Sequence, residues 1–164
     1  MNPAFARQLV EAAQSLGAQQ SETFWARSRS TRVEYGNNRF QTAATAEAAG
    51  LGLRVIAAGR LGFVSTCRPQ RPAELAQLAL ETAEHGDQIE PGFEFAGPRR
   101  GGSIVEPYDE AVASLRPQAM RDMARGAISR LGNQSAVLAG AQIASQVTEV
   151  GLVTSNGFEA SYRR

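Results

Sequence analysis

The residue types that most often do chemistry are scarce in this sequence, which has one His, His85, and one Cys, Cys67. Hydrolysis at a zinc ion needs about three protein ligands and a position for water. Glu84-His85 is followed by Gly86-Asp87, so no HExxH or HExxxH pattern places a second His on the same helical face. Cys67 has no second His or other fixed base to activate its thiol. We therefore predict that this chain holds no catalytic, cofactor-binding or metal-binding residue.

Three further features imitate functional motifs. Gly50-Leu51-Gly52 looks like the start of a dinucleotide-binding loop, but that loop needs a strand before the glycines and a helix after them. Here the glycines fall inside a predicted strand with no third Gly at the required spacing, so we expect close packing or a bulge. Glu106, Asp109 and Glu110 could form a carboxylate pair, but they lie in an acidic loop, which favours a solvated surface over acid–base catalysis. His85 falls at a predicted helix end, where the helix dipole favours a solvated imidazole.

Basic residues could form a surface for phosphate. All 17 cations are Arg, and the net charge is only +1. Strand periodicity places Arg27 and Arg29 on one face. Arg residues on neighbouring predicted hairpins extend the set: Arg32, Arg39, Arg54 and Arg60. Such a face could bind nucleic acid, but the sequence has no Lys, no recognition helix and no row of stacking aromatics. We favour a solvated sheet face or partner contacts, and we interpret Trp25 and Tyr35 as core or interface residues rather than a ligand cage.

The spacing of apolar residues predicts three helices and a series of short strands. Helices are expected over residues 3–17, with Asn2 as N-cap, and over 72–86 and 117–131. Their apolar stripes are Phe5, Leu9, Ala13 and Leu16; Leu75, Leu78, Ala79 and Thr82; and Met120, Ala124, Ala127, Ile128 and Leu131. Strands are expected over 22–29, 31–35, 39–45, 50–56 and 60–66, with two or three more within 137–164. Turn residues at 36–38, 58–59 and 155–157 separate them. This pattern predicts an α+β fold of mostly antiparallel β-hairpins packed with three helices.

The two parts of the chain resemble each other. Residues 35–41, YGNNRFQ, are similar to residues 153–159, VTSNGFE, and each segment follows a helix that begins at Pro and ends at Gly. We therefore predict a duplicated helix-plus-strands unit, with a first copy at about 1–85, an acidic Gly/Pro linker at 86–115 and a second copy at 116–164. The last predicted strand still runs at Arg164, so we expect the second copy to be truncated.

The bulk composition predicts an ordinary intracellular domain. A chain of 164 residues can bury its own core without disulfides. The single Cys fits a reducing cytoplasm, no leader resembling a signal peptide is present, and no apolar run is long enough for a membrane span. We expect a cytoplasmic protein with no membrane partner.

Several of these segments together resemble the TldD/PmbA family. Residues 50–63, GLGLRVIAAGRLGF, are similar to the family's hallmark hairpin. The Arg27-Ser28-Arg29-Ser30 run and the Asn38-Arg39-Phe40 turn stand upstream of it, as in that family. Residues 155–163, SNGFEASYR, resemble the family's second hairpin. The resemblance extends from about Glu22 to Arg164.

This resemblance implies a larger protein and a partner. Members have an N-terminal α+β domain and a larger β-rich C-terminal domain, and TldD-type and PmbA-type chains assemble together. The TldD-type chain hydrolyses peptides at a zinc site built on an HExxxH helix in its later domain. Family names also refer to modulation of DNA gyrase and to maturation of a peptide antibiotic. Since that motif is absent here, no catalytic residue of the family can be assigned to this chain.

We therefore expect a non-catalytic N-terminal domain of a TldD/PmbA-type metallopeptidase subunit. It would help form the cavity that admits extended or unfolded polypeptide and would contribute to assembly with a TldD-type or PmbA-type subunit. Zinc is expected in the missing C-terminal part or in the partner subunit. The alternative is a nucleic-acid-binding or DNA-gyrase-associated modulator module. The type of the parent chain, TldD or PmbA, remains open.

Overall fold

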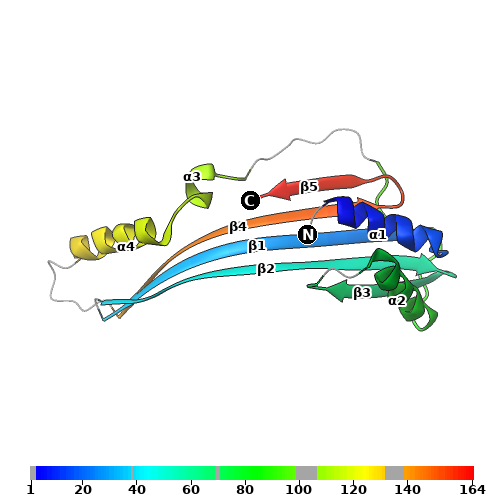
Figure 1. The fold of residues 1–164 in the computed structure, drawn as a ribbon, viewed down its shortest axis with the longest axis horizontal. Helices are drawn as coiled ribbons and strands as arrows, with labels where there is room; N and C mark the ends of the chain where they lie inside the picture. Colours follow the sequence, from blue (N-terminus) through cyan, green and yellow to red (C-terminus); the bar gives the residue numbers. More distant parts are fainter. Residues whose placement is uncertain (1–2, 38, 69–70, 99–106, 132–138) are drawn as a thin grey trace. The chain divides into compact units, whose positions relative to one another are not determined.

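The computed structural model describes residues 3–37, 39–68, 71–98, 107–131 and 139–164. Asn2, the predicted N-cap, and Asn38, in the predicted turn, lie outside these ranges. The elements in chain order are α1 (Pro3–Ser15), β1 (Gln20–Gly36), β2 (Arg39–Ala57), β3 (Arg60–Thr66), α2 (Pro72–Glu84), α3 (Glu110–Ala113), α4 (Pro117–Leu131), β4 (Gly140–Thr154) and β5 (Glu159–Arg163) (Figure 1). The predicted α+β class is confirmed. No helix among the described residues is long and apolar enough to cross a membrane.

The strands form one sheet in the order β3-β2-β1-β4-β5. β2 pairs antiparallel with β3, with Leu53 opposite Val64, and β4 pairs antiparallel with β5, with Val150 opposite Tyr162. The turn between β2 and β3 has positive φ at both Ala58 and Gly59, as a tight two-residue hairpin requires.

The predicted strand boundaries were wrong in β1 and β2. The two strands expected over 22–29 and 31–35 are one strand, β1, and those expected over 39–45 and 50–56 are one strand, β2. Ser30, which falls between the two predicted strands, continues the alternation of β1. Because β1 is paired on both sides, its backbone hydrogen bonds form whatever the side chain. The strand expected over 60–66 and the helix expected over 117–131 are confirmed.

The described part of residues 86–115, predicted as an acidic Gly/Pro linker, contains packed and hydrogen-bonded residues. Phe95 is buried, with 3% of its surface exposed. Asp109 accepts hydrogen bonds from the backbone N–H groups of Ala111 and Val112 and so caps a single helical turn, α3. Asp87 also bonds to the sheet, since its carbonyl accepts a hydrogen bond from the N–H of Leu61 in β3. The Gly- and Pro-rich composition of this part of the sequence does not predict these contacts.

The chain divides into two compact units, each with its own core. The first contains residues 1–27, 48–106 and 149–163, and in it α1 and α2 cover one face of the sheet. Its largest buried side chains include Leu9, Trp25, Leu53 and Leu75. This burial of Trp25 agrees with its interpretation as a core residue.

The second unit contains residues 28–47 and 107–148, together with Arg164. Met120 and Ala124 of α4 pack on Val33 and Tyr35 of β1. The Tyr35 hydroxyl donates to the carbonyl of Arg121 at 3.1 Å, so this buried phenol keeps a hydrogen bond. The prediction of a duplicated helix-plus-strands unit stays a prediction.

Small residues bring α2 close to the sheet. Its buried side chains are Leu75, Ala76, Ala79 and Ala83. The predicted stripe was therefore partly wrong: Leu78 is exposed, and so is Leu16, which lies beyond the end of α1. The α2 backbone passes so near β3 that a Cβ on Gly62 would lie 2.1 Å from the Ala79 carbonyl oxygen. Ala127 of α4, predicted inward, is exposed as well.

Replacing Gly62 by Ala should destabilise the first unit by about 1–3 kcal/mol, because the added methyl group meets backbone that cannot yield without moving α2. Gly50→Ala is the matched control in the neighbouring strand, where the nearest atom to a new Cβ, the Thr66 carbonyl oxygen, is 3.7 Å away. Urea unfolding followed by fluorescence of the single Trp, Trp25, measures both. Equal stabilities would contradict the close packing of α2 on β3.

Candidate binding groove

The sheet of the first unit has two chemically different faces, because successive strand residues point to opposite sides. Trp25, Leu53 and Val55 face α1 and α2 and are buried. Their neighbours Phe24 and Arg54 point to the other face. That face carries exposed aromatic rings: 50% of the surface of Phe24 and 53% of that of Phe63 is accessible.

A groove of about 1100 Å³ lies on this second face, and we call it the sheet groove. It is open to solvent along its length, and most of its lining is apolar. It is lined by Glu22, Phe24, Ala26, Gly50, Leu51, Gly52, Arg54, Phe63, Ser65, Thr66, Cys67 and Leu152. All of these residues belong to the first unit.

Glycines in β2 form part of the groove lining. A Cβ on Gly52 would lie 3.0 Å from Cε2 of Phe63, so the Phe63 ring lies over the strand where a side chain would otherwise stand. The expectation of close packing fits this contact at Gly52, whereas a Cβ on Gly50 would meet no atom nearer than 3.7 Å. The absence of side chains at these two positions also leaves room for a guest beside Phe24 and Phe63.

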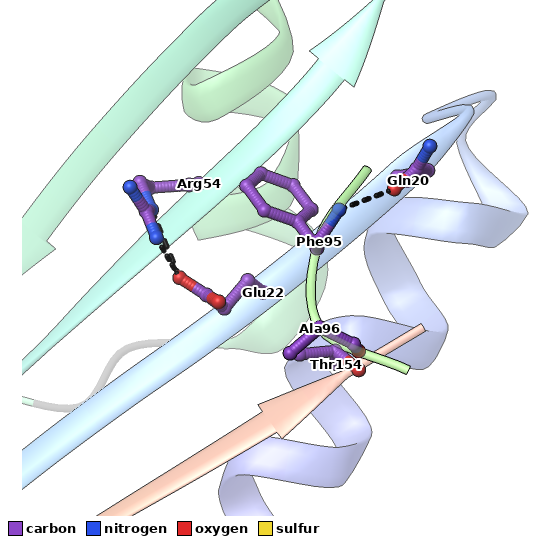
Figure 2. A network of polar contacts seen from close by, with 6 residues as sticks. All are labelled: Gln20, Glu22, Arg54, Phe95, Ala96 and Thr154. Carbon is purple, nitrogen blue, oxygen red and sulfur yellow. Dashed lines mark hydrogen bonds and ion pairs between the residues drawn. The ribbon is translucent and has the colours of Figure 1, made fainter. Parts of the chain in front are cut away.

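Residues 93–97 cross one end of this face, and we call them the strap (Figure 2). The N–H of Phe95 donates to Oε1 of Gln20 at 2.8 Å, and the hydroxyl of Thr154 donates to the carbonyl of Ala96 at 2.7 Å. Nδ2 of Asn156 donates to both Oε1 of Gln20 and the carbonyl of Phe95. The strap is thus bonded to β1, to β4 and to the turn after β4.

An ion pair lies beside the strap. Nε of Arg54 donates to Oε1 of Glu22 at 2.9 Å, and Nη2 contacts the same oxygen (Figure 2). The Glu22 side chain is only 8% exposed, whereas that of Arg54 is 46% exposed. The Phe95 ring centroid is 5.2 Å from Cζ of Arg54, within the range of a cation–π contact. The pair therefore satisfies a nearly buried carboxylate and leaves this end of the groove without net charge.

Most of the Arg residues singled out from the sequence have acidic or carbonyl partners. Ion pairs join Arg27 to Glu149 at 3.3 Å and Arg29 to Glu47 at 3.7 Å, and Arg32 to Glu34 at 3.7 Å. Nη1 of Arg60 donates to the carbonyl of Gly86 at 2.8 Å. These pairs neutralise much of the charge that a phosphate backbone would need.

The other residues considered from the sequence are not brought together. Cys67 is exposed at the rim of the sheet groove, and His85 is exposed at the C-terminal end of α2. Asp109 caps α3, and Glu110 accepts from the Tyr108 hydroxyl at 2.9 Å. Glu106 lies outside the described residues.

The described residues do not fit a zinc centre. Among them, no three His, Cys, Asp or Glu side chains lie close enough together to hold a metal ion. Sequence reasoning did not identify Phe24 and Phe63 as groove residues, and only Phe24 had a signal that could have done so. Phe24 alternates with the buried Thr23 and Trp25, which places an aromatic ring on the face opposite the core.

Comparisons with known proteins agree with this architecture. Residues 21–84 match the family domain described as PmbA/TldA metallopeptidase domain 1. The fold is shared with a proposed modulator of a DNA gyrase from Thermotoga maritima (TM-score 0.84, 16% identity, 98% of this chain and 36% of that one). It is also shared with TldE from Thermococcus kodakarensis (0.81, 18%, 97% and 36%). A proposed modulator of DNA gyrase from Bacteroides thetaiotaomicron matches similarly (0.84, 22%, 99% and 38%). No sequence of a curated protein matches the chain.

The fold and the matched segment define an α+β domain that forms little more than a third of its structural relatives. Over residues 21–84 this chain is similar to the first domain of the PmbA/TldA metallopeptidase family, and over nearly its whole length it has the fold of the three solved structures.

Phe95→Ala should destabilise the first unit by about 2–4 kcal/mol, because it removes a buried ring and uncovers the Glu22–Arg54 pair. Phe93→Ala is the control within the strap, since Phe93 is 45% exposed, and it should cost about 1 kcal/mol or less. Denaturant midpoints measured through Trp25 fluorescence compare the two. Similar losses for both variants would show that Phe95 does not anchor the strap.

Proposed function

We propose that this chain is the non-catalytic, substrate-side domain of a TldD/PmbA-type metallopeptidase subunit. In this role it helps form the cavity that admits extended or unfolded polypeptide, and it contributes to assembly with a TldD-type or PmbA-type subunit. The family match of residues 21–84 is the observation that carries the proposal. The sheet groove supports it, because a mostly apolar groove whose charged residues Glu22 and Arg54 are paired suits polypeptide better than it suits a polyanion.

The groove and the sheet edges would act together on such a guest. Exposed apolar rings such as Phe24 and Phe63 can cover side chains of many kinds, because burial of apolar surface is not directional. An unpaired strand edge offers N–H and C=O groups to any extended chain, largely regardless of its sequence. Together these features would favour unfolded over folded substrates, since only an extended chain exposes its backbone.

Zinc would then be held outside this chain, in a C-terminal part of the parent protein or in the partner subunit. The metal would supply a Lewis acid and an activated water there. The role of the present residues would be to bind and align polypeptide rather than to move protons.

The purified chain should not cleave an unstructured peptide such as casein, with or without added zinc, because its described residues supply no ligand set. With a full-length TldD-type or PmbA-type subunit, light scattering should detect a complex.

Phe63→Ser should weaken crosslinking of the unstructured peptide to the chain several-fold, whereas Leu78→Ser, at an exposed leucine on α2, should not. Cleavage by this chain alone would refute the non-catalytic role.

The second candidate is a nucleic-acid-binding or gyrase-associated module. Two structural relatives are described as proposed modulators of DNA gyrase, and every cation of this chain is Arg. The ion pairs of Arg27, Arg29 and Arg32 argue against a phosphate-binding face.

Titration with duplex DNA at two salt concentrations separates the candidates. We expect negligible binding near physiological salt, because Arg27, Arg29 and Arg32 are paired with acidic residues and the net charge is only +1. Sub-micromolar binding that weakens steeply with salt would favour the nucleic-acid module instead.

A further inference from the structure

A second pocket lies within the second unit, on the face of the sheet that packs against α4. It has a volume of about 180 Å³ and is more enclosed than the sheet groove. Its polar lining comes from β1, from β4 and from the segment between α3 and α4: Arg29, Thr31, Ser145, Ser114 and Arg116. All of these residues belong to the second unit, and we call the site the Arg pocket.

The Arg pocket carries two cations, and no carboxylate of the described residues lines it. Arg116 has no acidic partner in the described part of the chain. Arg29 is paired with Glu47, but their closest atoms are 3.7 Å apart and both side chains are more than two-thirds exposed. A solvent-exposed pair at this distance contributes little, so Arg29 remains available to a better-placed anion. The pocket is therefore electropositive.

The N-terminus of α4 adds to this positive charge. The carbonyl of Arg116 accepts a hydrogen bond from the N–H of Met120 at 3.1 Å, which makes Arg116 the N-cap residue. A guanidinium cannot accept hydrogen bonds from the first turn, and that turn contains no acidic residue. α3 is different, because the carboxylate of Asp109 caps it. A cation at the positive end of a helix dipole is unfavourable unless an anion lies beside it.

Two hydroxyl groups of the pocket have donor capacity to spare. Thr31 is only 6% exposed and shares one hydrogen bond of 3.2 Å with the hydroxyl of Thr45. That bond uses one of the two hydroxyl hydrogens, so when Thr45 donates, the hydrogen of Thr31 is left for another acceptor. The Ser145 hydroxyl donates to the thioether sulfur of Met120 at 3.9 Å, which is a weak acceptor. Such donors suit the oxygen atoms of an anion better than an apolar guest.

We propose that the Arg pocket binds a small tetrahedral oxyanion that carries a phosphoryl group. The guanidinium groups of Arg29 and Arg116 bind its charged oxygens, and the hydroxyls of Thr31 and Ser145 donate to them. The pocket has the volume of about six water molecules at roughly 30 Å³ each, which suits one phosphate group. It is smaller than the roughly 300–1,000 Å³ of sites for drug-sized ligands, so it does not admit a peptide segment or a whole nucleotide.

This inference goes beyond the proposed function, because the Arg pocket and the sheet groove share no residue. It is also distinct from nucleic-acid binding. A duplex presents each phosphate as a diester within a long backbone, which does not enter an enclosed pocket of this size.

Titration of the ¹⁵N-labelled chain with inorganic phosphate, at an ionic strength held constant with chloride, tests the site by NMR. We expect saturable shifts of the Arg116, Gln118 and Ser145 amides. The amide of Trp25, in the first unit, should not move. Glycerol phosphate in a parallel titration distinguishes the source of the phosphoryl group. Tighter binding of inorganic phosphate supports the free ion as ligand, and tighter binding of glycerol phosphate supports a compact monoester.

Arg116→Gln should weaken phosphate binding about tenfold, because it removes a charge-assisted hydrogen bond. Arg125→Gln is the matched control, at an exposed arginine of α4 that pairs with Asp122 outside the pocket. It removes the same charge and should change binding less than about twofold, because salt screens distant surface charges. Glu47→Gln should instead strengthen binding, since it releases Arg29 from its present partner. Unchanged melting curves verify that the three variants fold.

Three results would overturn the proposal. Shifts that grow without saturation and spread over both units would mean general attraction of anions to the surface. Equal weakening by Arg116→Gln and Arg125→Gln would mean that net charge, rather than the pocket, controls binding. Weaker binding by Glu47→Gln would mean that Arg29 is not a ligand of the phosphoryl group.

Discussion

Alternation of side chains along β1 and β2 is the constraint on which the first unit depends. One set of residues, including Trp25 and Leu53, must be covered by α1 and α2, because burial of these apolar side chains is the main favourable term in folding. The intervening residues are then committed to the opposite face, whatever their chemistry. Phe24 and Arg54 stand on the groove side for this reason, and the sheet groove is a consequence of how the core is made.

The same constraint places charged side chains on the groove face of the sheet, where each needs a partner on a neighbouring strand. Glu22 points to the groove face but is nearly buried beneath the strap, so it needs a cation, and Arg54 on the neighbouring strand is within reach. Phe95 covers the guanidinium, and Gln20 and Asn156 hold the strap by its backbone. A segment that looks like a linker by composition therefore closes one end of the groove.

The β3 edge of the sheet is likewise covered by a neighbouring element, α2. Thr82 is the clearest case: its position on α2 suggested an inward core residue, whereas its hydroxyl serves the backbone of Phe63 at the sheet edge. The small side chains of α2 and the missing side chain of Gly62 allow this approach. The β3 edge of the sheet is therefore closed by α2, on the side of the sheet opposite the groove's Phe24.

Several features follow from the amino-acid sequence alone: the α+β class, the helices predicted over 3–17, 72–86 and 117–131, the hairpin at Ala58–Gly59 and the resemblance to TldD/PmbA proteins. These are local properties, since helical periodicity, Pro and Gly positions and turn residues act within a few residues of each other. Other features became visible only in the folded chain: β1 and β2 are continuous, Phe95 is buried, Arg27, Arg29 and Arg32 have acidic partners, and Thr82 closes an edge. Each of these depends on which residues from distant parts of the chain become neighbours, and a pattern read along one strand does not contain that information.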